Sequence, residues 1–392
     1  MVGNAHPTKG GYWHVNNDMD HLKIFVIGTR GFPNVQGGVE RHCEELYPRL
    51  AEKGCEITVA FRPPYIPVEK RMTSWRGISL VPVWCPRKKA FEAIVHSVLG
   101  VIAARRNSPD ILHIHAVGPS IVTPLAKLLG LKVVVTNHGP DYQRAKWGKV
   151  AKAILKLGEY FGTKYSNQVI VISRTIQNLL ADQYGKTDTV LIPNGVTKPA
   201  IAAGGETMKK YGLDPDSKYV FTAVRFVPEK GLHDLIGAYR KIENPPFKLV
   251  IAGDADHETA YSRQIKKMAG ETPGVVLTGF TSGEPLAELF SNAGLFILPS
   301  YYEGLPIALL EAMSYELPVL VSDIPQHKEV PLPEKRYFAV GNVDQLAVKM
   351  KALLAEGIDE EEKARQRAMI EERYNWDRIA EATLGVYRSI GK

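Results

Sequence analysis

Two carboxylates, Glu303 and Glu311, flank a Gly-Leu-Pro triplet in the sequence YYEGLPIALLEAM at residues 301–313. The stretch lies between two short apolar segments that are typical of buried strands. We expect Pro306 at the first position of a helix, where proline is well tolerated. Gly304 permits close approach of the backbone, and the unpaired N–H groups at the helix start favour an anion such as phosphate.

The separation of the two carboxylates indicates the kind of ligand that they could hold. Glu303 is expected in the loop and Glu311 on the second helical turn, so each can accept hydrogen bonds from hydroxyls at a different end of one ligand. A ligand with sugar hydroxyls at both ends and phosphates in the middle is a nucleotide sugar. The alternative is that both glutamates are solvated, but solvation does not account for the apolar LPIALL between them.

Two cations flank a turn between a predicted strand and a predicted helix in AVRFVPEKGLHDLI, residues 223–236. Arg225 and Lys230 are well placed there to neutralise a diphosphate. Charges at a strand end are often merely solvated, but together with the two glutamates they favour a phosphate site.

Glycines follow the first predicted strand in GTRGFPNVQGGVERHCEEL, residues 28–46. This is not the dinucleotide fingerprint, because Arg30 replaces its second glycine and the second strand ends near Arg62 with no acid to hold a ribose. Gly37 and Gly38 directly precede a helix and favour a backbone site for phosphate. The alternative is a turn kept for tight packing.

Histidines form a second group of candidates. His138 and Asp141 follow a strand, where a histidine facing a cleft could bind a donor hydroxyl, orient an acceptor or carry a proton. The alternative is a structural hydrogen bond. His113 and His115 point to one face of a strand, but no carboxylate stands nearby, and we predict no metal site from them.

Short β-branched apolar runs, each followed by a helical stretch, make up most of the chain. Many are apolar on both faces, as the strands of a parallel sheet covered by helices must be. They predict an α/β protein with two Rossmann-like, doubly wound domains that face a central cleft. The runs lie at 22–28, 56–61, 78–84, 110–115, 132–137, 168–173 and 189–194, then, after a Gly- and Pro-rich linker, at 218–224, 247–253, 274–280, 294–300 and 317–322.

Composition supports an ordinary globular protein. The 392 residues exceed one typical core, and 45% are hydrophobic and 23% charged. The longest apolar stretch, residues 90–104, carries Glu92 and His96 and is shorter than a bilayer span. Residues 1–20 contain no apolar signal region and are expected to be disordered, and Met19 is an alternative start. Three cysteines suggest neither a disulfide framework nor a metal cage, which fits the cytoplasm.

Charge is unevenly distributed. Residues 1–196 hold 25 Lys and Arg against 14 Asp and Glu, a net charge of +11, and the remainder carries −4. This basic half suits an anionic partner such as the inner face of the plasma membrane. Nucleic acid is not expected, because no aromatic interleaving, zinc pattern or helix-turn-helix pattern accompanies the charge. Four lysines recur at roughly helical spacing around Trp147: Lys146, Lys149, Lys152 and Lys156.

Together these motifs resemble the retaining GT-B glycosyltransferases of family four. The resemblance covers nearly the whole chain, from GTRGFPNVQGGVERH through TNHGPDYQRAKW and VRFVPEKG to PSYYEGLPIALLEA and WDRIAEATLGVYRSI. Its most specific mark is the E-x7-E pattern that Glu303 and Glu311 carry. The clear departure is Glu316, where the family usually has a glycine in the left-handed conformation.

The resemblance implies a role for each candidate residue. Arg225 and Lys230 would hold the donor diphosphate, Glu311 the ribose, and Glu303 and His138 the transferred sugar, with the base stacked near Gly279 and Phe280. It implies no cofactor and no metal, because arginine and lysine replace the ion. The implied catalytic set is His138, Arg225, Lys230 and Glu303, and the implied donor-binding set is Gly37, Gly38, Gly279, Phe280, Gly304, Leu305, Pro306 and Glu311.

Domain limits follow from the same resemblance. Residues 21–196 together with about 375–392 would form the acceptor-binding N-terminal domain, because the helix from about Trp376 usually crosses back. Residues 197–374 would form the C-terminal domain, which binds the nucleotide sugar.

The expected activity is retaining transfer of a hexose from a nucleotide diphosphate sugar, a UDP-sugar first and a GDP-sugar second. The acceptor would be a glycan or a lipid-linked sugar in polysaccharide or glycoconjugate synthesis. Three alternatives remain open at this point: a nucleotide-sugar epimerase of the same fold, an oxidoreductase, which Arg30 and Arg62 disfavour, and an inactive sugar-nucleotide-binding scaffold.

Overall fold

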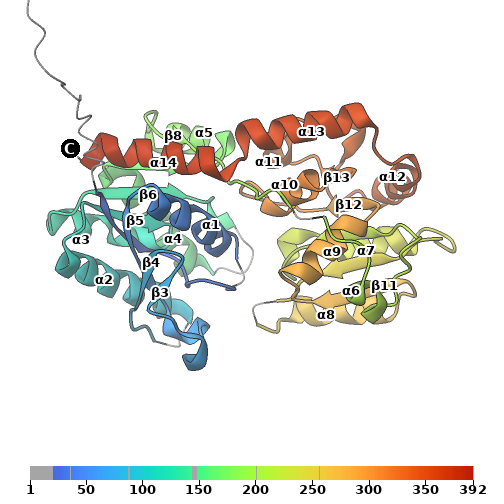
Figure 1. Ribbon diagram of the computed structural model, residues 1–392, viewed down its shortest axis with the longest axis horizontal. Coiled ribbons are helices and arrows are strands. Elements are labelled where there is room, and N and C mark those ends of the chain that lie inside the picture. Colours follow the sequence, from blue (N-terminus) through green and yellow to red (C-terminus); the bar gives the residue numbers. More distant parts are fainter. Residues whose placement is uncertain are drawn as a thin grey trace, which may run out of the picture.

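The strands form two separate sheets (Figure 1). The computed structural model describes residues 21–391 except 36, 87–88, 144–147, 200 and 256. The predicted disordered segment 1–20 lies outside the described residues, as do Lys146 and Trp147 of the predicted basic helix.

Within the described residues the N-terminal sheet has eight strands in the order β3-β4-β2-β1-β5-β6-β7-β8. Neighbours are parallel except β3 and β4. The strands are β1 (Lys23–Ile27), β2 (Glu56–Phe61), β3 (Ser74–Trp75), β4 (Ile78–Pro82), β5 (Ile111–His115), β6 (Val133–Asn137), β7 (Gln168–Val171) and β8 (Val190–Leu191). The helices of this half are α1 (Gly38–Glu52), α2 (Lys89–Asn107), α3 (Thr123–Leu128), α4 (Lys149–Tyr165) and α5 (Arg174–Tyr184).

The C-terminal sheet has six strands, all parallel, in the order β11-β10-β9-β12-β13-β14. They are β9 (Val220–Ala223), β10 (Leu249–Ala252), β11 (Val275–Gly279), β12 (Leu295–Leu298), β13 (Val319–Ser322) and β14 (Tyr337–Phe338). The helices that follow the linker are α6 (Glu206–Lys210), α7 (Leu232–Arg240), α8 (Ala260–Gly270), α9 (Glu284–Asn292), α10 (Ile307–Ser314), α11 (Pro325–Lys328), α12 (Val343–Glu356), α13 (Glu360–Arg373) and α14 (Trp376–Gly391).

Burial explains why these segments form strands. The central strands β5, β6, β10, β12 and β13 are buried at every residue, because helices cover both faces of a parallel sheet. Each apolar run noted in the sequence contains a strand, so the predicted α/β fold with two doubly wound domains is confirmed. The two-residue strands β3 and β14 were not predicted.

The last helix, α14, packs on the N-terminal half although it follows the C-terminal sheet (Figure 1). Trp376, Ile379 and Tyr387 are buried in one core cluster with residues of β1, β2 and α1. The Val196 N–H donates to the Tyr374 carbonyl at 2.8 Å, so the two places where the chain passes between the halves lie side by side. We therefore propose domain limits near 196 and 375, as the sequence predicts.

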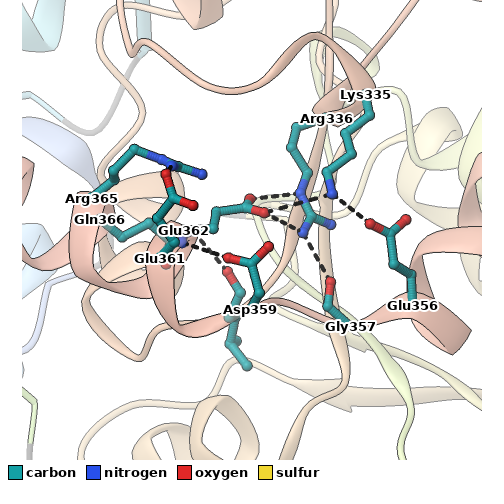
Figure 2. A network of polar contacts seen from close by, with 10 residues as sticks. Lys335, Arg336, Glu356, Gly357, Asp359, Glu361, Glu362, Arg365 and Gln366 are labelled. Carbon is teal, nitrogen blue, oxygen red and sulfur yellow. Dashed lines mark hydrogen bonds and ion pairs between the residues drawn. The ribbon is translucent and has the colours of Figure 1, made fainter.

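Helix α13, which leads into α14, is anchored by a buried ion pair (Figure 2). The fully buried Arg336 donates to both carboxylate oxygens of Glu362, at 2.7 and 2.8 Å. Asp359 caps the helix by accepting the Glu362 N–H at 2.7 Å. Removing either member of the pair would leave a buried charge without its partner, so this contact holds the start of α13 in place.

Candidate active site

Two loops at the carboxyl ends of β9 and β12 are tied together in the C-terminal domain. The Tyr301 N–H donates to the Glu229 carbonyl at 2.9 Å. Gly231 has φ 63°, and a Cβ there would lie 2.1 Å from the Pro299 carbonyl oxygen. Only glycine permits this approach, and the approach brings Lys230 beside Glu303.

Lys230 and Glu303 form an ion pair that the sequence analysis did not predict. The Lys230 Nζ lies 2.5 Å from the Glu303 Oε1, and both side chains are largely buried. The Ser300 hydroxyl donates to the same oxygen at 2.7 Å. Burial alone would raise the pKa of the Glu303 carboxyl, but the Lys230 charge and these hydrogen bonds hold it below its usual value. Both contacts use Oε1, and in the part of the chain that the structure describes Oε2 makes no hydrogen bond.

Further buried groups support this ion pair through a chain of hydrogen bonds to Ser300. The Ser322 hydroxyl, at the end of β13, donates to the Ser300 carbonyl at 2.5 Å. The His327 Nδ1 lies 2.8 Å from the Ser322 carbonyl and must therefore donate to it. The His327 Nε2 has no hydrogen-bond partner among the described residues. We call Lys230, Glu303, Ser300, Ser322 and His327 the Glu303 cluster.

Glu311 lies on α10 and faces helix α1 of the N-terminal domain. Its carboxyl group is half-buried and makes no side-chain hydrogen bond within the described residues. Burial raises its pKa, the positive charge of Arg41 opposes that shift and the charge of Glu45 adds to it. Arg41 itself pairs with Glu45 at 3.0 Å, so Glu311 keeps a carboxylate available to hydroxyl groups of a ligand.

Pro306 differs slightly from its predicted place. It is the N-cap residue of α10, with an extended backbone, and the helix begins at Ile307. Its carbonyl accepts the N–H groups of Leu309 and Leu310 at 3.2 and 3.4 Å. The prediction of a first helical residue was therefore wrong by one position, because the chain is still extended there.

Gly37 and Gly38 have different surroundings, and the prediction that both precede the helix is wrong for Gly38, which is the first residue of α1. Gly37 is the N-cap, and a Cβ on it would lie 1.9 Å from Oε2 of Glu40, which is itself paired with Arg30. Gly38 is exposed, and a Cβ there would meet nothing within 4 Å. The backbone φ of 153° favours glycine at position 37, whereas Gly38 presents open backbone at the helix start.

His138 lies where the two domains touch. A Cβ on Gly304 would lie 2.7 Å from the His138 carbonyl oxygen, and one on Gly139 would lie 3.1 Å from the Tyr302 hydroxyl. The Asn194 amide also donates to the Leu305 carbonyl across the interface, at 3.1 Å. The TNHG and YYEGL motifs, far apart in sequence, are therefore adjacent.

The imidazole of His138 is kept neutral. Burial, together with the neighbouring His113, lowers its pKa to about 3. Its Nε2 lies 3.0 Å from the His115 Nδ1. A neutral imidazole at this place can exchange hydrogen bonds with hydroxyl groups but adds no positive charge to the cleft.

The remaining candidates stand on the same edge of the C-terminal sheet. Arg225 follows β9 and is half-buried. Gly279 ends β11 with φ 71°. Phe280, next in the chain, is 52% exposed. An aromatic ring that remains half in solvent is suited to stacking against a flat ligand.

Ser300, Ser322 and His327 were not among the residues predicted from the sequence. They support Glu303 through hydrogen bonds rather than by their own contact with the cleft. The available signal was that Ser300 and Ser322 each end a strand run, at the edge where the other candidates gather.

Comparison with known proteins decides the family. Residues 36–198 match the family described as Glycosyltransferase Family 4, and residues 205–376 match Glycosyl transferases group 1. The chain belongs to this group of glycosyltransferases. It is an enzyme of sugar transfer, and the epimerase and oxidoreductase alternatives are not favoured.

Relatives and solved structures agree with this assignment. The UDP-Gal:alpha-D-GlcNAc-diphosphoundecaprenol alpha-1,3-galactosyltransferase of Escherichia coli is 32% identical over 310 residues, 74% of this chain and 73% of the relative. Sucrose-phosphate synthase from Thermosynechococcus elongatus has a TM-score of 0.78 at 21% identity, covering 94% and 99% of the two chains. Anabaena Alr3699/HepE in complex with UDP-glucose has a TM-score of 0.77 at 17% identity, covering 94% and 100%. The predicted GT-B fold is confirmed, and glycosyltransferase relatives act in polysaccharide or glycoconjugate synthesis.

No helix in the described part of the chain is both long enough and apolar enough to span a bilayer.

Proposed function

We propose that this glycosyltransferase moves a hexose from a UDP-sugar, with retention of configuration, to a lipid-linked sugar of a surface polysaccharide pathway. The observation that carries the proposal is the Lys230–Glu303 ion pair, which lies beside the His138 loop of the other domain. It combines a fixed cation for phosphate with a carboxylate oxygen for a sugar hydroxyl.

Donor binding would use the C-terminal side of the cleft. Within the described residues the Lys230 Nζ donates to Glu303, so its remaining N–H groups can donate to a diphosphate, with Arg225 as the second cation. Glu311 would accept the ribose hydroxyls, and Phe280 at the end of β11 would stack on the base. The backbone at Gly38, Gly304, Leu305 and Pro306 would complete the phosphate site. Anabaena HepE was solved with UDP-glucose, which supports UDP over GDP.

The chemistry would rest on fixed charge. The bond between the anomeric carbon and the diphosphate oxygen breaks, and the acceptor oxygen bonds that carbon on the same face. The acceptor proton passes to the departing diphosphate oxygen. Arg225 and Lys230 stabilise the negative charge that develops there. Oε2 of Glu303 and the neutral His138 hold the sugar hydroxyls during transfer.

Donor identity is tested first by binding. Thermal melts against a panel of nucleoside diphosphates should show the largest stabilisation with UDP. Incubation with the UDP-sugar alone should slowly release UDP and should yield no isomerised nucleotide sugar. The anomeric configuration of the transferred sugar, measured by NMR, should match that of the donor. Stronger stabilisation by GDP would overturn the base assignment, and inversion would overturn the mechanism.

An exposed face of α4 supports the acceptor assignment. Val150, Leu157 and Tyr160 are 75%, 43% and 38% exposed and lie at helical spacing. Lys149 and Lys156, also exposed, stand on the same face. An apolar stripe among lysines favours the interface of an anionic bilayer. The Escherichia coli relative is named for a diphosphoundecaprenol acceptor, which would be reached from such a surface.

Sedimentation with anionic vesicles tests this membrane contact. Binding should fade with added salt and weaken when Lys149, Lys152 and Lys156 are changed to Glu. Replacing Val150 and Leu157 by Ser should also weaken it, through loss of apolar burial. The matched control changes Lys241, Lys266 and Lys267 of the C-terminal domain to Glu and should leave binding unchanged. Absence of binding at low salt, or equal loss in the control, would overturn the membrane assignment.

A further inference from the structure

Three histidines from three elements of the N-terminal domain converge on one point. His42 comes from α1, His115 ends β5, and His138 follows β6. One ring nitrogen of each lies within 4.8 Å of the other two. The closest pair, Nδ1 of His115 and Nε2 of His138, is 3.0 Å apart. We call these three residues the histidine cluster.

The distances suit a small metal ion. A tetrahedral zinc ion with bonds of about 2.1 Å holds its ligand nitrogens about 3.4 Å apart. The closest pair needs to open by a fraction of an ångström, and His42 needs to move inward. Zinc and neighbouring transition metals bind imidazole nitrogens well, whereas calcium and magnesium prefer oxygen ligands. A set of three imidazoles therefore favours a metal of the zinc type.

The ring nitrogen of His42 that points away from the cluster has a hydrogen-bond partner, as is usual for metal-binding histidines. Its Nδ1 lies 3.0 Å from the Asn194 Oδ1. The Asn194 Nδ2 donates to the Leu305 carbonyl, which sets the orientation of the amide. The oxygen of Asn194 can only accept, so Nδ1 of His42 carries the proton and Nε2 keeps its lone pair for a ligand.

The His115 ring is oriented in the same way. Its Nε2 lies 2.5 Å from the Tyr47 hydroxyl, which is in turn 3.0 Å from the His113 Nδ1. Tyr47 is fully buried, so its hydroxyl is fixed between the two rings. In the tautomer in which Nε2 donates to Tyr47, Nδ1 of His115 keeps its lone pair toward the centre of the cluster. Such outer partners orient metal ligands and tune their affinity.

Access to the cluster comes from the cleft. His42 and His115 are buried, whereas His138 is half-buried beside the Gly304 loop. A metal held by the three rings would keep its fourth position on the His138 side. It would also occupy the His138 Nε2, so that this nitrogen could no longer bind a sugar hydroxyl.

We propose that His42, His115 and His138 form a site for a divalent transition metal of the zinc type, and that its occupation inhibits sugar transfer. The metal is an inhibitor in this proposal and not a cofactor. The inhibition rests on the proposed role of His138, but the binding does not.

Cobalt titration of the chelator-treated full chain tests the site directly. One equivalent of Co²⁺ should give the intense visible bands of low-coordinate cobalt, and Zn²⁺ should displace them. His42→Gln and His115→Gln should each weaken binding by more than the roughly 100-fold that loss of an outer partner costs. His257→Gln, an exposed residue outside the cluster, is the matched control and should bind as the wild type does.

Asn194→Ala keeps all three rings and removes the outer partner of His42, together with the amide bond to the Leu305 carbonyl. It should weaken Co²⁺ binding by roughly 10- to 100-fold, and it keeps the test available if the glutamine variants do not fold. Absence of the bands, or equal binding by the wild type and all variants, would overturn the site.

Activity separates the site from the proposed function. Chelation alone should leave transfer unchanged, whereas one equivalent of Zn²⁺ should inhibit it and excess chelator should restore it. If Co²⁺ and Zn²⁺ bind as expected but transfer continues, the metal site stands and the role given to His138 is wrong. Loss of activity on chelation, restored by the metal, would overturn the inhibitory role.

Discussion

The two sides of the cleft are built on different kinds of polar cluster. The Glu303 cluster contains a buried ion pair, and its serines and His327 hold one carboxylate oxygen against Lys230. The hydrogen bonds of the histidine cluster, within the described part of the chain, go to a tyrosine, an asparagine and one another. One side offers fixed charge and the other offers neutral rings.

This difference matches the two tasks that a sugar transferase must perform. A departing diphosphate needs positive charge that is already in place when its own charge develops. A sugar or acceptor hydroxyl needs a group that can donate or accept without adding charge. The contrast supports the proposal that positive charge for the diphosphate comes from the C-terminal domain, and single substitutions test it.

Removing the cation should have the largest effect. Lys230→Ala should abolish transfer and weaken UDP binding by about 2–3 kcal/mol, or roughly 30- to 150-fold, because a charge-assisted contact in a largely buried site is lost. Isothermal titration calorimetry with UDP measures the change.

The matched control for that variant is Lys241→Ala. Lys241 pairs with Asp344 on the exposed surface, where such a pair contributes little. It should leave both UDP binding and transfer unchanged. Undiminished UDP binding by Lys230→Ala would show that the diphosphate is held elsewhere.

The second test concerns the acid at the other end of the donor. Burial raises the pKa of Glu311 above the 4.5 of an ordinary glutamate. As pH falls through that raised value the carboxylate is protonated, so charge-assisted bonds to the ribose hydroxyls become neutral ones. UDP binding should weaken about tenfold over this window, and the change should begin above pH 4.5.

Glu311→Gln is the control for this pH dependence. It should bind UDP about tenfold less tightly at neutral pH and lose most of the fall on acidification. If Glu311→Gln keeps the full pH dependence of UDP binding, another titrating group causes that dependence.

The fold was predictable because its signal is local. Strands buried on both faces give continuous apolar runs, and each run contained a strand. Strands β3 and β14 were missed because neither lies in an apolar run long enough to show a pattern. Lys230 and Glu303 were both chosen as candidates, but their contact depends on the bond between the Tyr301 N–H and the Glu229 carbonyl, which joins loops about 70 residues apart.

Supporting residues were harder to predict than cleft residues. His115 was noticed and set aside because nothing in its neighbourhood suggested a partner. Its neighbours His42 and His138 come from α1 and from the end of β6, and only the packing of α1 and β6 around β5 brings the three together. Ser322 and His327 likewise act through Ser300, and no local pattern marks such indirect support.

The third test weakens the Glu303 cluster without removing charge. Ser300→Ala deletes one hydrogen bond to Glu303 Oε1, which contributes about 1 kcal/mol, so transfer should fall roughly fivefold. The serine lowers the pKa of Glu303, so its loss should raise that pKa and shift the acid limb of the pH–rate profile to higher pH. Ser314→Ala, whose hydroxyl donates to the backbone carbonyl of Glu311, should change neither. If the acid limb of the Ser300→Ala profile does not move, Ser300 does not influence the protonation of Glu303 during transfer.

The smallest effect, a change in stability, should come from a residue that follows α10, the helix that carries Glu311. Glu316 follows the end of α10 and has φ 58°, a left-handed conformation that costs a residue with a side chain about 1–2 kcal/mol. Glycine avoids this strain but loses about 0.5–1 kcal/mol through greater freedom in the unfolded chain. Glu316→Gly should therefore raise stability by about 0.5–1 kcal/mol and leave UDP binding unchanged. The exposed ion pair of Glu316 with Arg367 is lost at the same time, and surface pairs contribute little.

Urea unfolding followed by circular dichroism measures the change in midpoint. Two variants isolate its cause. Arg367→Ala removes the ion pair but keeps the strained backbone, so it should not raise the midpoint. Glu271→Gly places a glycine at the end of α8, where φ is −86° and no strain is relieved, so it should lower the midpoint. If Glu316→Gly stabilises no more than Glu271→Gly does, backbone strain at Glu316 is not a measurable part of the stability of this domain. If Glu316→Gly also alters UDP affinity, the backbone after α10 affects the site that binds UDP. The contrast between the Glu303 cluster and the histidine cluster then does not rest on charge alone.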